Sequence, residues 1–420
     1  MSVPDGIAER DNKLYVGMGV EEMLNRLTNA YKKDSPFRLF LMSLVLSGIG
    51  YGIYKGMLDN YLAQVACMGE LDRGITEFFR ELPGLMLVFL LAVFYTFSAE
   101  RMFKIGAVIM LAGMTMQSVI PANKVLIIIA IFIYSLGEHI QLGMRSTMAL
   151  EYSHEGRGGE ALGYQNASYQ IGTLAGYIII AIAFTVWAAV QPFKPFFFIS
   201  AVLVLISMLF AFGIRADSET DKTKSRFYFR RKFGKYYMLE VFYGARKQVF
   251  FTFGPYVLIL FYGANATVIS LLFAISAIAC FICSPIVGKI IDRVGYKIVM
   301  ISDTLILVIV CFFYGFAHHI FPMHIAFMVC CVNYVLDSVI SLASMASSVY
   351  VQDISDDQEE MRATISTGIS VNHMITILIA LFGGWIWQTL GMETLFILSA
   401  ILGLCNSAYA ATIKKGSGKR

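Results

Sequence analysis

Charge is what this sequence has least of. Lys, Arg, Asp and Glu make up 15% of its 420 residues, hydrophobic residues make up 57%, and the mean hydropathy is +0.67. A soluble domain of this length cannot hide that much apolar surface. The net charge is only +4, and the basic residues flank apolar runs instead of forming a patch, which argues against a nucleic-acid partner. The composition predicts a helical protein that crosses a lipid bilayer many times.

Catalytic and metal-binding signatures are also missing. Of the 7 cysteines, Cys280 and Cys283 form a C-x-x-C pair, but no second pair or nearby histidine completes a metal or redox site. The segment HEGRGGE, residues 154–160, lacks the H-E-x-x-H spacing of zinc proteases. No Ser/His/Asp spacing or phosphate-binding loop lies at a membrane edge. We therefore expect no enzyme, no cofactor, no metal site and no disulfide framework.

Long apolar runs dominate what is present. Runs able to cross about 30 Å of hydrocarbon begin near residues 37, 82, 103, 124, 161, 194, 238, 266, 297, 322, 363 and 391. Lys and Arg gather at both ends of the chain and after the even-numbered runs, which predicts that both termini face the cytoplasm. The stretch RGITEFFRELPGLM, residues 73–86, is interpreted as the first outer loop.

The chain divides into two similar halves. The longest polar connection lies between runs six and seven, and SAERMFKIGAVIM (98–110) occupies the same place in the first half as IIDRVGYKIVMIS (290–302) in the second. Glu138 in the fourth run lies opposite Asp337 in the tenth. Two such halves around a pathway are typical of a transporter, with solute bound near mid-membrane. The predicted parts are an N-terminal segment with an amphipathic helix (1–35), a six-helix bundle (36–214), a linker (215–235), a second six-helix bundle (236–413) and a basic tail (414–420).

One short motif links the sequence to a known family. Residues 288–297, GKIIDRVGYK, match the pattern G-x-x-x-D-R-x-G-x-K/R, and with the twelve spans and the repeated halves they resemble the major facilitator superfamily. The resemblance implies an all-α membrane fold of two pseudo-symmetric six-helix bundles that rock to give alternating access. No motif of a particular subfamily is present. The motif residues are Gly288, Asp292, Arg293, Gly295 and Lys297, with Glu100 and Arg101 in a degraded first-half copy.

The motif has a plausible gating chemistry. Asp292 can accept hydrogen bonds from nearby helix N-termini and from Arg293, while Gly295 permits a tight turn. We expect these groups to form a latch that holds the cytoplasmic side shut and is released during transport. The alternative is an ordinary charged loop.

Three ionisable residues lie in the middle of the fourth run. Each costs several kcal/mol in a bilayer unless it is paired or wetted. On a helix, Glu138, Gln141 and Arg145 fall within about 60° of one face, while His139 points about 100° away. Glu138 and Arg145 are two turns apart, about 10 Å along the backbone. The two interpretations are a functional polar face and a structural ion pair.

Other runs carry polar faces as well. On a continuous helix, Asn333, Asp337, Ser341, Ser344 and Ser348 of the tenth run lie within about 80° of one another. Close packing through small hydroxyl residues is the alternative, but it needs no carboxylate. The remaining polar residues of interest are Asn166 and Gln170 in the fifth run, His373 in the eleventh, Arg246 in the seventh and Lys55 in the first.

Two of the charged residues have simple structural alternatives. Lys55 and Asp59 are four residues apart and can pair with each other, or reach the outer interface. Asp303, near the inner edge of the ninth run, is explained equally well as the partner of a loop cation and as part of a polar pathway.

The leading hypothesis is a secondary transporter of a small polar or anionic organic solute, working as a symporter driven by protons or sodium. A carboxylate in a low-dielectric cavity can load and unload a proton, and histidine titrates near neutral pH. The proton-coupling candidates are Glu138, Asp337, His139 and His373. The solute-binding candidates are Arg145, Gln141, Asn166, Gln170, Asn333, Ser341, Arg246 and Lys55.

Two alternatives remain open. The 33 Phe, 22 Tyr and 22 Met suit a multidrug or lipid-like exporter with an adaptable apolar pocket. The other alternative is a membrane sensor or scaffold that transports nothing. We expect a monomer in a bacterial cytoplasmic membrane, with a small-molecule solute and the driving ion as its partners.

Overall fold

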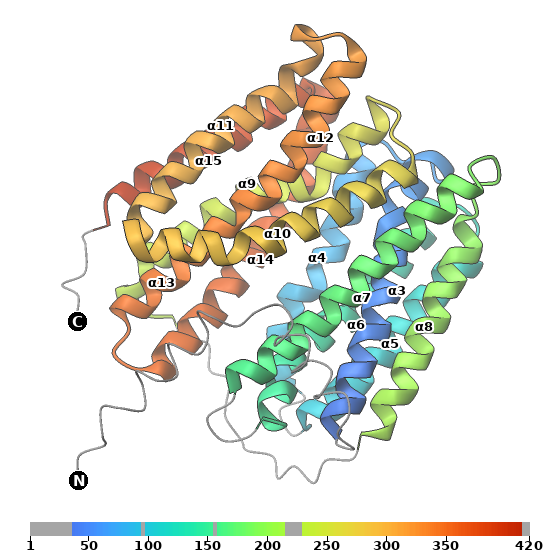
Figure 1. Cartoon of the computed structure of the whole chain (residues 1–420), viewed down its shortest axis with the longest axis horizontal. Helices are drawn as coiled ribbons and strands as arrows, with labels where there is room; N and C mark the ends of the chain where they lie inside the picture. The colour runs from blue at the N-terminus through green and yellow to red at the C-terminus, as the bar shows by residue number, and fades with distance from the viewer. Residues whose placement is uncertain (1–35, 94–96, 154–157, 215–228, 414–420) are drawn as a thin grey trace.

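The computed structural model describes residues 36–93, 97–153, 158–214 and 229–413. The predicted amphipathic helix, most of the linker and the basic tail lie outside these ranges. Every element assigned in the described ranges is helical, and the long helices form two groups that meet along α4, α7, α10 and α14 (Figure 1). This arrangement confirms the predicted all-α membrane fold.

The first half contains six long helices. They are α3 (Pro36–Asn60), continued by the π-helical turn η1 (Tyr61–Val65), α4 (Glu70–Val93), α5 (Ala99–Val119), α6 (Lys124–Glu151), α7 (Gly158–Val186) and α8 (Phe193–Gly213). The second half begins with a 3₁₀ turn, η2 (Arg231–Phe233), and also has six long helical segments. They are α9 (Gly234–Leu260), α10 (Ala266–Val294), α11 (Tyr296–Ile320), α12 (Met323–Ile340) joined through η3 (Ser341–Ser344) to α13 (Met345–Ile354), α14 (Gln358–Leu390) and α15 (Met392–Ala411).

Ten of these segments are long and apolar enough to cross a membrane. The other two, α4 and α9, carry more charge but have 24 and 27 residues. At 1.5 Å per residue, each is more than about 35 Å long, enough to span the hydrocarbon core. The described ranges therefore contain the twelve spans that the apolar runs predict.

The second span begins earlier than predicted, and its first half is not a loop. Helix α4 starts at Glu70 instead of near residue 82, so the whole stretch 73–86 is helical. Within it, Arg73, Glu77 and Glu81 are each less than 9% exposed. The assignment to an outer loop was wrong because these charges are neutralised by partners on their own and neighbouring helices.

The tenth span is broken, which corrects the continuous polar face predicted for it. The 3₁₀ turn η3 separates α12 from α13. The hydroxyls of Tyr243 and Ser344 both donate to the carbonyl oxygen of Ser341, each at 2.9 Å. Asn333 and Asp337 therefore lie on α12 and Ser348 on α13, and the α-helical spacing does not run through all five residues.

Successive long helices run in opposite directions, so the connections between them lie alternately on two sides of the molecule. The terminal side carries Pro36, Ile214 and Ile413, while the distal side carries the connections 66–69 and 261–265. On the distal half, α4 crosses α14 closely through Gly74 and Gly384. A Cβ on Gly74 would lie 2.5 Å from the carbonyl oxygen of Ala380, so only glycine permits this approach.

Hydrogen bonds between the halves gather on the distal side. The Asn60 amide donates to the carbonyl oxygen of Ala264 at 2.8 Å. The Tyr256 hydroxyl donates to the carbonyl oxygen of Met68 at 2.7 Å. The Ser270 hydroxyl donates to the carbonyl oxygen of Gly56, also at 2.7 Å. These bonds hold α3 and the start of α4 against α9 and α10, so the two halves are closed together at this end.

Candidate functional site

Glu138 lies in the middle of α6, where its carboxylate has polar neighbours but no bonded partner among the described residues. The side chain is half-buried, and no hydrogen bond or ion pair joins its carboxylate to another described residue. It interacts electrostatically with Arg80 and with a group of tyrosines that includes Tyr51, Tyr134 and Tyr169. The carboxylate is therefore available to a proton or to a solute.

Arg145 does not pair with Glu138, although the two share a helix face. Its guanidinium carbon lies 3.8 Å from the ring centroid of Tyr169 on α7, and the residue is 3% exposed. Its Nε–H has no hydrogen-bond partner within the described ranges. The Gln141 amide instead donates to the carbonyl oxygen of Phe103 at 3.4 Å, between α6 and α5. Arg145 thus keeps donor capacity, whereas Gln141 contributes to helix packing.

A chain of buried charges runs along the start of α4, and the sequence interpretation missed it. Its members alternate in sign along adjacent helices. The links are Lys55–Asp59 (2.9 Å), Asp59–Arg73 (3.2 Å), Arg73–Glu77 (2.8 Å), Glu77–Arg80 (2.6 Å), Arg80–Glu81, and Glu81–His373 (2.9 Å). The signal was the spacing of Arg73, Glu77 and Arg80, since residues three and four apart on a helix are neighbours. The Lys55–Asp59 pair confirms the structural alternative raised for those two residues.

The second half of the protein contacts this chain of buried charges through aromatic and amide groups. The ammonium of Lys55 lies 5.3 Å from the ring centroid of Phe251 and 5.4 Å from that of Phe273. Arg80 lies 5.0 Å from the centroid of Phe251. The Gln248 amide donates to Glu77 at 3.2 Å. Lys55 is thus engaged by a carboxylate and two aromatic rings and offers less to a solute than the sequence suggested.

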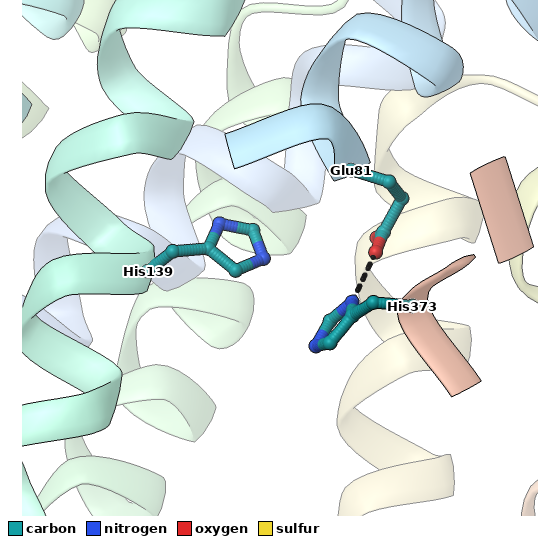
Figure 2. Close-up of side chains that lie close together, drawn as sticks. All are labelled: Glu81, His139 and His373. Carbon is teal, nitrogen blue, oxygen red and sulfur yellow. Dashed lines mark hydrogen bonds and ion pairs between the residues drawn. The ribbon is translucent and has the colours of Figure 1, made fainter. Parts of the chain in front are cut away.

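Two predicted histidines meet where the halves touch. His139 of α6 and His373 of α14 have ring centroids 5.5 Å apart, and His373 is bonded to Glu81 of α4 (Figure 2). The structure therefore brings together two proton-coupling candidates from different halves. Glu81, the partner of His373, was not among the residues singled out in the sequence.

Asp337, the counterpart of Glu138, lies on α12 in the second half. It is 7% exposed, and no described side chain forms a hydrogen bond or ion pair with its carboxylate. Arg246 and Lys247 of α9 interact with it electrostatically. Arg246 itself is paired with Asp303 at 2.7 Å, whereas Lys247 is exposed. The partner of Asp303 is therefore a cation buried in a helix, and not the loop cation considered as one alternative.

A small pocket on α9 contains a second acid that the sequence analysis did not consider. Glu240 is 9% exposed and accepts hydrogen bonds from Ser347 at 2.9 Å and from the Asn372 amide at 3.3 Å. The Arg246–Asp303 pair lines the same pocket. An acid within a membrane-spanning helix was the available signal.

The other solute-binding candidates differ in how exposed their side chains are and in whether those side chains already have a hydrogen-bond partner. Asn166 and Gln170 are exposed on α7. Asn333 is 6% exposed, and its amide donates to the carbonyl oxygen of Val329 in its own helix at 2.8 Å. Ser341 lies in the turn η3. Their contact with a solute stays a prediction.

The gating motif lies at the junction of α10 and α11 on the terminal side. Gly295 has a φ of +87°, which the residue joining the two helices must adopt and which favours glycine. Asp292 and Arg293 are exposed, and the Lys297 ammonium donates to the carbonyl oxygen of Ile413 at 2.8 Å. In the same motif, nothing lies within 4 Å of a Cβ added at Gly288. The degraded first-half copy keeps an ion pair between Glu100 and Lys104, and its Arg101 is exposed. The latch itself stays a prediction.

Comparison with known proteins identifies the class. Residues 236–416 match the profile of the Major Facilitator Superfamily. The nucleoside transporter NupG has the same fold, with a TM-score of 0.72 at 16% identity over 90% of this chain and 100% of that one. The D-xylose-proton symporter gives 0.71 at 13% identity, covering 91% and 98%, and a POT family transporter in complex with 5-aminolevulinic acid gives 0.70 at 11%, covering 89% and 94%.

Residues 236–416 thus match the family whose motif they contain, and the described fold as a whole is shared with these solved structures. Each of these three proteins is named as a transporter or symporter, and the twelve long helical segments described above make this chain a multi-pass membrane protein. No subfamily is assigned, and no curated protein matches the sequence significantly.

Proposed function

We propose that the chain is a proton-coupled symporter of a small polar or anionic organic solute. The observation that carries this proposal is a pair of carboxylates, Glu138 and Asp337, that occupy equivalent helices of the two halves without an ion-pair partner among the described residues. An acid left unpaired in a membrane is costly unless it serves a function. Loading and unloading a proton is a function that relieves this cost.

Arg145 and Lys247 are the best cations for the solute. Arg145 stacks on Tyr169 and retains an unused donor, and Lys247 is exposed near Asp337. A guanidinium held in this way recognises a carboxylate or phosphate well. Arg246 is less suitable because Asp303 already neutralises it.

Alternating access follows from the closure on the distal side. We propose that both termini face the cytoplasm of a bacterial cell, so the distal side is the outer one. The bonds from Asn60, Tyr256 and Ser270 then close the outer side. In this arrangement the solute leaves or enters on the terminal side, where the gating motif lies.

The test starts from an unbiased metabolite screen by thermal shift on the purified protein, since a bound ligand stabilises the fold. Uptake of the resulting solute is then measured in proteoliposomes with a pH gradient. Glu138→Gln and Asp337→Asn are expected to retain binding but lose accumulation. Glu393→Gln, an acid at the distal end of α15, is the control. Unchanged accumulation in both variants excludes the coupling role, and hits confined to hydrophobic cations favour the exporter instead.

A further inference from the structure

Three metal-binding side chains converge between the halves. Glu81 of α4 and His139 of α6 come from the first half, and His373 of α14 comes from the second (Figure 2). One ligand atom from each residue lies within 4.8 Å of the others. Glu81 and His139 are buried, and the side chain of His373 is 23% exposed, which leaves a route for a small ion.

The hydrogen bonds of His139 prepare one nitrogen for an ion. Its Nδ1 lies 2.9 Å from the carbonyl oxygen of Ser135 and 3.0 Å from the Ser135 hydroxyl. Because a carbonyl oxygen only accepts, we assign the hydrogen to Nδ1, which leaves the lone pair on Nε2. A backbone carbonyl on the far nitrogen is the usual way in which proteins orient a metal-binding histidine.

The other two ligands are oriented as well. The Nδ1 of His373 lies 2.9 Å from one carboxylate oxygen of Glu81, while Arg80 binds the other oxygen. A metal ion would take the place of the proton shared by His373 and Glu81. Gly84 provides the space, because a Cβ there would lie 2.9 Å from Nε2 of His139 and 3.0 Å from Nδ1 of His373.

We propose that Glu81, His139 and His373 form a site for a divalent transition-metal ion such as Zn²⁺, and that the bound ion holds the two halves together. Two imidazoles and one carboxylate suit Zn²⁺ and not Mg²⁺ or Ca²⁺, which prefer oxygen. Zinc at about 2.1 Å from each ligand needs ligand atoms about 3.4 Å apart. Side-chain rotations that move the ligand atoms by about 1 Å bring them to that spacing, and water fills the fourth position on the ion.

The consequence is inhibition of transport by the ion. The site is complete only while α14 lies against α4 and α6, so the ion binds this closed arrangement better than one in which the halves have parted. A ligand shifts an equilibrium by its difference in affinity for the two states. The bound ion therefore stabilises the distal-closed state, whatever solute is carried and whether or not a proton is coupled to it.

A second cluster provides an internal control. His318 and His319 of α11 lie 3.3 and 3.2 Å from one carboxylate oxygen of Glu393 on α15. Both helices belong to the second half. An ion bound there links nothing between the halves.

The experiment measures binding of Co²⁺ and Zn²⁺ to the full chain in detergent. Co²⁺ reports its ligands through visible absorption, and Zn²⁺ stabilisation is followed as a shift in thermal unfolding. The variants His139→Asn and His373→Gln keep a side-chain amide that can donate to Ser135 or Glu81 and so favour folding. Glu81 stays unchanged because Arg80 depends on it. The control is His318→Gln combined with His319→Gln.

We expect the control to keep a visible Co²⁺ band and a Zn²⁺-dependent rise in unfolding temperature. His139→Asn and His373→Gln are each expected to lower the apparent affinity at least about tenfold, given that loss of even an outer-shell group has that effect. If metal binding survives in both variants and disappears in the control, the ion occupies the distal cluster and the proposal is overturned. Absence of binding to the unaltered chain at millimolar Zn²⁺ overturns it as well. Neither readout depends on solute or proton flux, so either failure leaves the transport proposal intact.

Discussion

Two buried arginines of similar exposure differ in what surrounds them. Arg246 has a carboxylate at 2.7 Å, while Arg145 has the ring of Tyr169 and no carboxylate among the described residues. The Nε–H of each arginine lacks a hydrogen-bond partner within the described ranges. The pair with Asp303 neutralises Arg246, whereas no described carboxylate is bonded to Arg145. At the scale of residues, the partner decides the role more than the charge does.

The Arg246–Asp303 pair can be tested by removing one or both partners. Arg246→Met leaves a buried carboxylate without its counter-charge, which costs about 3–5 kcal/mol. The double variant Arg246→Met with Asp303→Leu is expected to recover most of that loss, because no charge is left behind. The unfolding temperature in detergent measures both. A drop in solute affinity from Arg246→Met with unchanged stability would restore the solute-binding role predicted from the sequence.

Single residues were predictable only in part. The helical period placed Glu138 and Arg145 on one face, and the repeat of the halves paired Glu138 with Asp337. Whether Glu138 meets Arg145 depends on side-chain directions and on the position of Tyr169 in another helix. The contact of His373 with Glu81 joins residues 292 positions apart, which no local pattern in one sequence reveals.

At the scale of elements, α4 shows why the hydropathy of the sequence located the spans but placed the start of the second one too late. Apolar runs identify helices that face lipid, and ten segments are of this kind. The first turns of α4 face protein instead, where Asp59 and Gln248 provide partners for Arg73 and Glu77. A hydropathy average along the sequence treats charged residues as part of a loop, so it cannot recognise such a segment. The break at η3 was equally hidden, because the hydroxyl of Tyr243 that bonds Ser341 comes from α9.

The crossing of α4 and α14 yields a prediction for an element. A Cβ added by Gly384→Ala would lie 2.8 Å from the carbonyl oxygen of Glu70 and 3.1 Å from the Cα of Gly74. The helices must move apart, and we expect a loss of about 1–3 kcal/mol, measured as a lower unfolding temperature. The matched control is Gly163→Ala in α7, where nothing lies within 4 Å of the new Cβ. Equal effects of the two variants would show that the crossing is not tight.

At the scale of the whole molecule, one cysteine reports the orientation. Cys67 is exposed in the distal connection between η1 and α4, whereas Cys405 and the remaining five lie within long helices. With both termini in the cytoplasm, a membrane-impermeant maleimide is expected to label Cys67 in intact cells. Cys67→Ser should abolish that labelling. Labelling only after permeabilisation would mean that the chain is inserted the other way round.

The chain of charges along α4 has a further consequence for how the halves part. Its three cations, Lys55, Arg73 and Arg80, and its three anions, Asp59, Glu77 and Glu81, all belong to the first half. The second half meets them with an amide, aromatic rings and the imidazole of His373. The Arg246–Asp303 pair lies entirely in the second half. The six charges of this chain of ion pairs thus balance within the first half, and parting the halves breaks none of the ion pairs among them.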